Sequence, residues 1–266
     1  MKKIGLIAGN GRFPFLVAEE IKKNGDQVIC VGLKEEADPG LEKLCDKYFS
    51  LSVGKFQKIV DALKSESVET AVLAGQVKHV KIYSAISMDW RAVKVMGSLI
   101  NKKTDTILGT IANEFLKDGI TLLPSHMYLK SLLPEKGLIA GKKLSADENK
   151  DVEFGFKIAK GIAGFDIGQT VVVKDKSVLA VESVEGTDEC IKRAYQLGGG
   201  NSVVVKVAKP NQDFRFDVPV IGTRTVDILK DNKVRVMAIE AGVTLILDRE
   251  EVEKKAKESG VTIVAV

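Results

Sequence analysis

Residues 3–33, KIGLIAGNGRFPFLVAEEIKKNGDQVICVGL, decide the fold class of the first part of this chain. A short apolar strand ends at a glycine, a segment with helical spacing ends at Asn24-Gly25, and a second apolar strand, QVICVGL, follows. A helix over 55–67 and a strand over 70–77 continue the pattern, and a helical region over 85–117 precedes a further strand at 120–124. Strands separated by helices of this length predict a parallel sheet with helical crossovers, that is, a Rossmann-like α/β domain.

The rest of the sequence predicts a second α/β domain with a mixed sheet. A helix over 151–164 precedes TVVVKDKSVLAVE, which indicates two strands around the turn residues Asp175 and Lys176. A later helix is expected to begin with Thr187 as its N-cap. Prolines, glycines and the polar run SADENK punctuate the region between the two patterns. We therefore assign residues 1–130 to the N-terminal domain, 131–147 to a linker and 148–266 to the C-terminal domain.

Composition and charge are those of an ordinary soluble globular protein. The chain has 266 residues, of which 45% are hydrophobic and 29% charged, and a net charge of +4. This charge suits an anionic ligand but is too small and too dispersed to predict nucleic-acid binding. The apolar start breaks at a glycine turn and no apolar run approaches the ~18 residues of a membrane span, so we expect a cytoplasmic protein. Cys30, Cys45 and Cys190 are far apart, which indicates reduced thiols.

Two turns follow predicted strands in the N-terminal domain. In GNGRFP, Gly9 and Gly11 could let the backbone approach a phosphate at a helix N-terminus. Pro14 stands where the dinucleotide fingerprint requires its third glycine, which disfavours a full dinucleotide site. A plain strand-to-helix turn and a nucleotide contact of another kind both remain compatible with this turn.

The second turn, GQVKHV, places Gly75 and Gln76 at the carboxyl end of a strand, where α/β sheets bind ligands. Lys78 and His79 could meet a phosphate there, but a surface turn explains them equally well. The chain has only one other histidine, His126, and neither histidine is signalled as catalytic by its surroundings.

The loop VESVEGTDEC collects acids between a predicted strand and a predicted helix. Helix capping accounts for Asp188, because acids in a first turn are stabilising without any further function. It accounts poorly for Glu182 and Glu185, which precede the helix. Such a group of oxygens suits a hard cation such as Mg²⁺.

The stretch KPNQDFRFD, 209–217, alternates charged and aromatic residues. If it were extended, Asp213, Arg215 and Asp217 would lie on one side and the phenylalanines on the other. One interpretation is an edge strand with a solvated charged face, and the other is a site for a charged substrate. At roughly 3.3 Å per residue, the two aspartates of an extended strand would be about 13 Å apart, too far to share one metal ion. Either the stretch bends, or the two acids do different work.

Several runs resemble the signature sequences of the LpxI-type UDP-2,3-diacylglucosamine pyrophosphatases. They are IGLIAGNGRFP, GQV, DIGQTVVV, VLAVESVEGTDECIKRA, VKVAKPNQDFRFDVPVIGTRTVD and IEAGVTLILD. The resemblance covers nearly the whole chain and is strongest between residues 166 and 248. Two departures from the family pattern are visible: Lys78, His79 and Val80 follow GQV in place of an Arg-Pro-like pair, and Thr104 and Asp105 replace a double acid.

The resemblance implies an enzyme of lipid A biosynthesis that hydrolyses UDP-2,3-diacylglucosamine to UMP and 2,3-diacylglucosamine 1-phosphate, or lipid X. It implies a divalent metal, usually Mg²⁺, and work at the cytoplasmic face of the inner membrane. A metal and cationic side chains would neutralise a diphosphate that otherwise repels an attacking water. We predict catalytic roles for Lys206, Lys209, Asp213, Arg215 and Asp217. The predicted metal ligands are Glu182, Glu185, Asp188, Asp213 and Asp217, and the predicted substrate-binding residues are Gly9, Gly11, Gly75, Gln76, Thr187 and Gln212.

Two other functions remain open from the sequence. A non-catalytic sensor of nucleotide sugars could use the same pocket without turnover, and a metal-supplemented turnover assay separates it from the enzyme. A nucleotide-dependent oxidoreductase would need the glycine fingerprint that Pro14 interrupts. Contact with the inner-membrane surface and assembly into a homo-oligomer are both compatible with the sequence.

Overall fold

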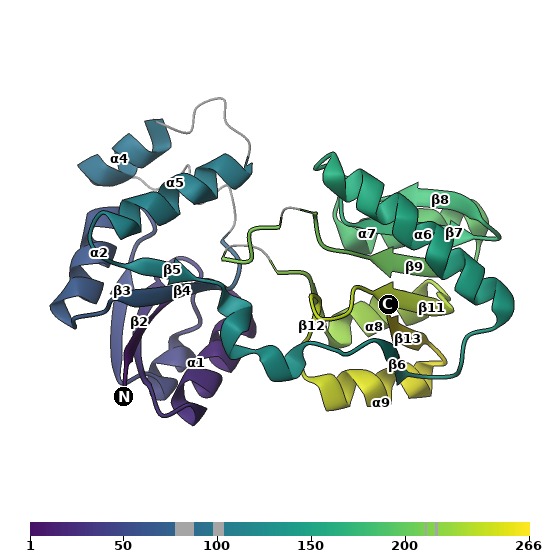
Figure 1. Cartoon of the computed structure of the whole chain (residues 1–266), viewed down its shortest axis with the longest axis horizontal. Coiled ribbons are helices and arrows are strands. Elements are labelled where there is room, and N and C mark those ends of the chain that lie inside the picture. Colours follow the sequence, from purple (N-terminus) through teal and green to yellow (C-terminus); the bar gives the residue numbers. More distant parts are fainter. Residues whose placement is uncertain (78–87, 98–103, 211, 216–217) are drawn as a thin grey trace. The chain divides into compact units, whose positions relative to one another are not determined.

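The computed structural model describes residues 1–77, 88–97, 104–210, 212–215 and 218–266 (Figure 1). The chain forms two compact units. The first comprises Met1–Leu129 with Asp213–Phe216, and the second comprises Lys130–Gln212 with Asp217–Val266. A short piece from the second half of the sequence therefore belongs to the N-terminal unit.

The N-terminal unit contains one parallel sheet in the order β3-β2-β1-β4-β5. Its strands are β1 (Lys3–Ala8), β2 (Gln27–Leu33), β3 (Lys47–Leu51), β4 (Thr70–Ala74) and β5 (Thr121–Leu123). The described helices of this unit are α1 (Phe13–Lys23), α2 (Phe56–Ser65), α4 (Trp90–Gly97) and α5 (Thr104–Leu116), with the 3-10 turns η1 (Pro39–Leu44) and η2 (Ser125–Tyr128). The predicted Rossmann-like parallel sheet is confirmed. The edge strand β3 is an addition, because its half-exposed sequence KYFSL lacks an apolar run.

The core of this unit forms where amphipathic helices cover the sheet. The helix α2 repeats apolar residues at helical spacing, so Phe56, Ile59 and Leu63 share one buried face. This face packs with Val31 of β2 and with Phe115 of α5 in a single apolar cluster. Burying this stripe fixes α2 on the sheet and leaves its charged residues outside.

The C-terminal unit contains a mixed six-stranded sheet in the order β6-β13-β11-β9-β7-β8. The strands β9, β11 and β13 are parallel, whereas β6, β7 and β8 pair antiparallel with their neighbours. The strands are β6 (Gly137–Ala140), β7 (Thr170–Lys174), β8 (Ser177–Val181), β9 (Val203–Lys206), β11 (Val236–Ile239) and β13 (Thr262–Ala265), with β10 (Val220–Ile221) and β12 (Leu245–Ile246) in a small parallel ladder. The helices are α6 (Ala146–Gly164), α7 (Thr187–Gly198), α8 (Thr223–Asp231) and α9 (Arg249–Ser259), after the 3-10 turn η3 (Lys130–Leu132).

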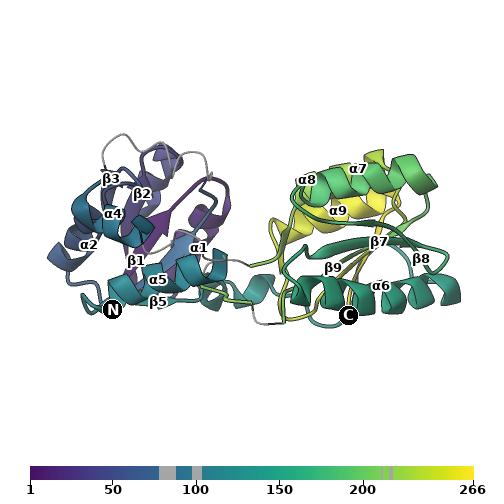
Figure 2. The same cartoon turned by 90° about the horizontal axis from the view of Figure 1, so that it is seen from above.

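Helices cover both faces of this sheet, as Figure 2 shows, with α6 on one face and α7, α8 and α9 on the other. Two apolar clusters fill the layers, one containing Ala159 of α6 and Val205 of β9, the other containing Ile191 of α7 and Met237 of β11. The predicted mixed sheet is therefore confirmed. The segment 131–147, which we expected to be a linker, supplies β6 to this sheet and the start of α6.

Local sequence explains why α6 begins early and where its neighbouring hairpin turns. Ser145 and Glu148 form a capping box, in which each side chain bonds the other residue's backbone N–H, at 3.1 and 2.7 Å. Asp151 of α6 accepts hydrogen bonds from the amides of Asp175 and Lys176, whose positive φ angles form the turn between β7 and β8. All three cysteines are free thiols.

Candidate functional site at the carboxyl edge of the C-terminal sheet

The topology gathers polar groups at one edge of the C-terminal sheet. The parallel strands β9, β11 and β13 all end at this edge, and β7 begins there because Thr170 pairs with Lys206. The helices α7, α8 and α9 each lead directly into one of these parallel strands, so their N-termini lie at the same edge. Helix N-termini favour anions, because their first amides point outward and the helix dipole is positive there.

A lysine, a threonine and a glutamate form a chain of hydrogen bonds at this edge. Lys206 Nζ donates to Thr187 Oγ1 at 2.9 Å, and Thr187 Oγ1 donates to Glu182 Oε1 at 2.9 Å. Glu182 Oε2 also accepts from the Gln169 amide at 3.3 Å. The structure therefore brings together three residues that the sequence singled out. Thr187 is the first helical residue rather than the N-cap, because Gly186 occupies that position with φ +82°.

The segment that follows β9 carries a second lysine. Lys209 Nζ forms an ion pair with Asp166, a residue of positive φ just after α6. Gln212 closes a small turn with Lys209: its Oε1 accepts from the Lys209 amide at 2.9 Å, and its own amide donates to the Lys209 carbonyl at 3.1 Å. Lys206 thus ends β9, and Lys209 is held by contacts of its side chain and backbone three residues later.

None of the described residues of KPNQDFRFD is in a strand, and Phe214 and Arg215 lie in a turn, so the edge-strand interpretation is wrong for these residues. Arg215 folds back on Asp213, with Nε 2.9 Å from Oδ1 and the terminal nitrogen 2.6 Å from Oδ2. The hydrogen bonds from Arg215 lower the pKa of Asp213, and Asp213 in turn raises the pKa of Arg215. Phe214 packs edge-on against His126, with ring centroids 4.9 Å apart. Asp217, the remaining predicted acid, lies outside the described residues.

The predicted metal ligands are not assembled by the described residues. Glu185 is paired with Arg193 at 2.6 Å, and Asp188 is paired with Arg224 at 2.9 Å. The hydrogen bond from Arg193 lowers the pKa of Glu185. Within the described ranges, no three acidic, histidine or cysteine side chains lie close enough to hold one metal ion. The described carboxylates by themselves therefore do not fit a metal site.

Sequence reasoning missed the ion pair of Lys160 and Glu240 at this edge. Glu240, directly after β11, accepts from Lys160 Nζ of α6 at 3.0 and 3.2 Å. Both side chains also bond Ala208, one of the two residues between the site lysines. The available signal was an acid directly after an apolar strand, in the run RVMAIEAG.

In the N-terminal unit, the predicted glycine turns bind each other. The amide of Gly9 donates to Ala74 O at 2.8 Å, and Asn10 and Gln76 exchange two backbone hydrogen bonds at 2.8 and 2.9 Å. A Cβ on Gly9 would meet Gln76 O at 2.5 Å, and one on Gly75 would meet Asn10 O at 2.6 Å. These two glycines are thus explained by the close approach of the two turns. Gly11, with φ +103° and open space beside it, is not constrained by a neighbour.

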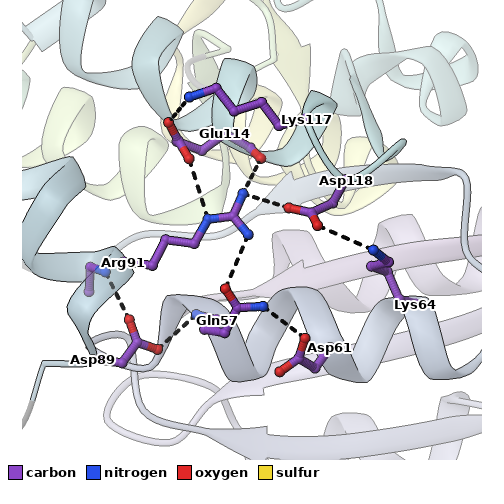
Figure 3. A network of polar contacts seen from close by, with 9 residues as sticks. Gln57, Asp61, Lys64, Asp89, Arg91, Glu114, Lys117 and Asp118 are labelled. Carbon is purple, nitrogen blue, oxygen red and sulfur yellow. Dashed lines mark hydrogen bonds and ion pairs between the residues drawn. The ribbon is translucent and has the colours of Figure 1, made fainter.

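A further charged cluster in the N-terminal unit centres on Arg91 (Figure 3). Arg91 is 6% exposed, and its guanidinium contacts Glu114 Oε2 at 3.3 Å, the Glu114 carbonyl at 2.6 Å and Asp118 Oδ2 at 2.5 Å. A fourth contact reaches Gln57 Oε1 at 3.3 Å, so Arg91 connects α4 with α5 and α2. Its charge is neutralised by neighbouring acids, and we interpret the cluster as structural rather than as a ligand site.

Residues 78–87 and 98–103 are not among the residues that the structure describes. The predicted phosphate contacts of Lys78 and His79 therefore stay predictions.

The fold and the site define an α/β protein that presents cationic side chains and helix N-termini at the carboxyl edge of a sheet. Two family models match the chain, the LpxI N-terminal domain over residues 3–132 and the LpxI C-terminal domain over residues 135–264. The chain belongs to the LpxI family.

A curated relative is similar over the whole chain. It is the UDP-2,3-diacylglucosamine pyrophosphatase LpxI of Caulobacter vibrioides, 31% identical over 100% of this chain and 98% of the relative. Among solved structures, N5-carboxyaminoimidazole ribonucleotide synthetase from Thermotoga maritima is 18% identical over 70% of this chain and 42% of its own length, with a TM-score of 0.28. Phosphoribosylglycinamide synthetase from Anaerococcus prevotii is 11% identical over 74% of this chain and 42% of its own length, also with a TM-score of 0.28.

Proposed function

We propose that this chain hydrolyses the diphosphate of UDP-2,3-diacylglucosamine, giving UMP and 2,3-diacylglucosamine 1-phosphate in lipid A biosynthesis. The observation that carries the proposal is the similarity to the Caulobacter pyrophosphatase, which extends over both domains and leaves almost no part of either chain unmatched. The cationic edge of the C-terminal sheet supports it, because a diphosphate needs positive groups around its oxygens.

The described residues divide this work between them. Among these residues, Lys206 donates to a neutral hydroxyl rather than to a carboxylate, so its charge stays available to a phosphate oxygen beside the N-terminus of α7. Lys209, which belongs to the same unit as Lys206, is a further cation for the developing charge. The catalytic role of Arg215, which belongs to the other unit, is proposed from the sequence pattern. Asp213 holds Arg215 with three side-chain contacts, so we assign it the orienting role. This assignment leaves Asp217 as the candidate for the essential acid.

A metal requirement is a separate proposal that rests on the family resemblance. If bound, Mg²⁺ would polarise a phosphoryl oxygen and lower the pKa of a coordinated water. Because the described acids do not form a site for it, we derive no step through the metal. Treatment with a chelator should abolish turnover and added Mg²⁺ should restore it. Full turnover after exhaustive chelation would contradict the requirement.

Contact with a membrane surface is also proposed rather than shown. No helix among the described residues is long and apolar enough to cross a bilayer. A diacylated substrate nevertheless resides in lipid, so we propose that the chain works at the cytoplasmic face of the inner membrane. Co-sedimentation with lipid vesicles tests this contact, and sedimentation analysis of the free protein tests the proposed homo-oligomer.

The test of the reaction is hydrolysis in heavy-oxygen water, followed by phosphorus NMR and mass spectrometry. Turnover should yield UMP and lipid X in equal amounts. We propose that water attacks the phosphorus on the sugar side, which predicts the label in lipid X and none in UMP. Label in UMP would show instead that water attacks the phosphorus on the uridine side. Tight binding of the substrate without any turnover would instead support a nucleotide-sugar sensor.

A further inference from the structure

The segment after β9 is held by side chains where strand pairing has ended. The amide of Val207 still donates to the Gln169 carbonyl at 2.9 Å. The next residue, Ala208, is 2% exposed and has no such strand partner for its N–H. Its N–H donates to Glu240 Oε2 at 2.8 Å, and its carbonyl accepts from Lys160 Nζ at 3.0 Å. Both polar groups of one buried peptide residue are therefore satisfied by an ion pair.

The two side chains that hydrogen-bond Ala208 come from different parts of the C-terminal unit. Lys160 lies in the last turns of α6, and Glu240 directly follows β11. Their side chains are 30% and 19% exposed, and their mutual contacts measure 3.0 and 3.2 Å. The roles cannot be exchanged, because the N–H needs an acceptor and the carbonyl needs a donor. We call this arrangement the Ala208 clamp, meaning Lys160, Glu240 and Ala208.

The position of the clamp points to a role in the site. Ala208 lies between Lys206, which bonds Thr187, and Lys209, which pairs with Asp166. A partly buried ion pair is weak evidence for stability, since apolar replacements are often equally stable. The apolar cluster under α6 contains neither of the two charged residues. The specific result of the ion pair is to fix the backbone from which both lysines extend.

We propose that Glu240 and Lys160 are positioning residues for the reaction: through Ala208 they hold Lys206 and Lys209 where the diphosphate binds. This role rests on the proposed function. Misplacement of a binding group by about 1 Å can cost on the order of a hundredfold in rate, so loosening the clamp should lower kcat more than it lowers stability.

The experiment compares Glu240→Gln and Lys160→Met with a matched control, Lys174→Met. Lys174 also donates to a backbone carbonyl, that of Gly198 at 2.8 Å, but at the opposite end of β7 from the site. We expect at least a tenfold fall in kcat for both clamp variants, near-normal kcat for the control, and similar small changes in melting temperature for all three. Lys160→Arg keeps a donor for both partners and should restore much of the activity.

Hydrogen–deuterium exchange separates failure of the clamp from failure of the proposed function. The peptide covering 207–209 should exchange faster in Glu240→Gln and Lys160→Met than in wild type, whether or not the protein turns over substrate. Unchanged exchange would show that the clamp does not hold this segment. Faster exchange with normal kcat would show that the clamp has no role in the reaction. An inactive wild type would reject the proposed function while the exchange data still tested the clamp.

Discussion

At the scale of single residues, the pairing of Asp213 with Arg215 changes how the charged turn should be understood. Alternation of charge in the sequence suggested one continuous charged wall. In the structure, Arg215 uses both its side chain and its amide to bond Asp213. The pKa of Asp213 is lowered by these hydrogen bonds, so this carboxylate is ionised and poorly suited to accept a proton near neutral pH. Its contribution is to keep the guanidinium in place.

The first residue-scale prediction compares Asp213→Asn with Asp217→Asn. The asparagine at 213 keeps an oxygen that can accept one hydrogen bond from Arg215, so turnover should fall moderately. Loss of an essential acid at 217 should lower turnover by orders of magnitude, since each 1.36 kcal/mol of barrier is tenfold. Turnover, substrate affinity and melting temperature are measured for each variant. Near-normal turnover in both variants would remove any catalytic role for this turn.

At the scale of elements, the two glycine turns of the N-terminal sheet show how a sequence motif can be satisfied internally. The sheet order changes direction between β1 and β4, and such a switch point is a common ligand site. Here the turns after these two strands exchange backbone hydrogen bonds. The amides of Gly9, Asn10 and Gln76 donate to backbone carbonyls in this contact. Gly9 and Gly75 lack side chains and so allow the two backbones to approach closely.

The matching prediction concerns Gly9→Ala and Gly11→Ala. A methyl group on Gly9 would lie 2.5 Å from Gln76 O, and the two turns would have to separate. At Gly11 the methyl group meets open space, and only the positive φ opposes it, at about 1–3 kcal/mol. Thermal unfolding should therefore show the larger loss for Gly9→Ala. Equal melting temperatures would contradict the close approach, and a selective rise in KM for Gly11→Ala would support its predicted substrate contact.

The Arg91 cluster predicts a stability effect that depends on three helices at once. Arg91→Met leaves Glu114 and Asp118 without a buried partner, which should destabilise the fold by about 3–5 kcal/mol. The surface pair of Lys255 and Asp227 is the control, and Lys255→Met should cost about 0–1 kcal/mol. Chemical denaturation measures both free energies of unfolding. A loss for Arg91→Met no larger than the control would show that the cluster is not structural.

The same cluster should make stability depend on pH. The hydrogen bond from Lys117 lowers the pKa of Glu114; burial raises the pKa of Asp118, but hydrogen bonds from Arg91 and Lys64 outweigh it and the net pKa is lowered. Groups with lowered folded-state pKa values stabilise the fold above their unfolded values of about 4, and this contribution is lost as pH falls through the folded values. Wild type should thus lose more stability than Arg91→Met between about pH 5 and pH 3.

Much of the fold follows from local sequence, and the exceptions have physical reasons. Apolar runs predicted β1, β2 and β4 because each is buried on both faces. The edge strands β3 and β6 lack such runs, and β6 lies between the proline and glycine signals that indicated a linker. At the site, Glu182, Thr187 and Lys206 could be singled out from the sequence because Glu182 follows β8, Thr187 begins α7 and Lys206 ends β9. The Ala208 clamp could not, since Lys160 and Glu240 are 80 residues apart.

At the scale of the whole molecule, the two units are interleaved along the chain. The N-terminal unit ends at Leu129 but takes back Asp213–Phe216, so the chain passes between units after residues 129, 212 and 216. Within the N-terminal unit, Phe214 from the returning piece packs on His126. The two family models, in contrast, divide the chain only once, between residues 132 and 135.

This interleaving has a consequence for how the halves can be inherited. Recombination between two homologous genes near codon 132 would exchange the halves at the family boundary, yet the N-terminal unit of the hybrid would contain a tetrapeptide encoded by the other parent. That tetrapeptide carries the Asp213–Arg215 pair and the aromatic ring beside His126. We therefore expect a chimaera joined near codon 132 to be more stable when residues 213–216 come from the same parent as the first half of the gene.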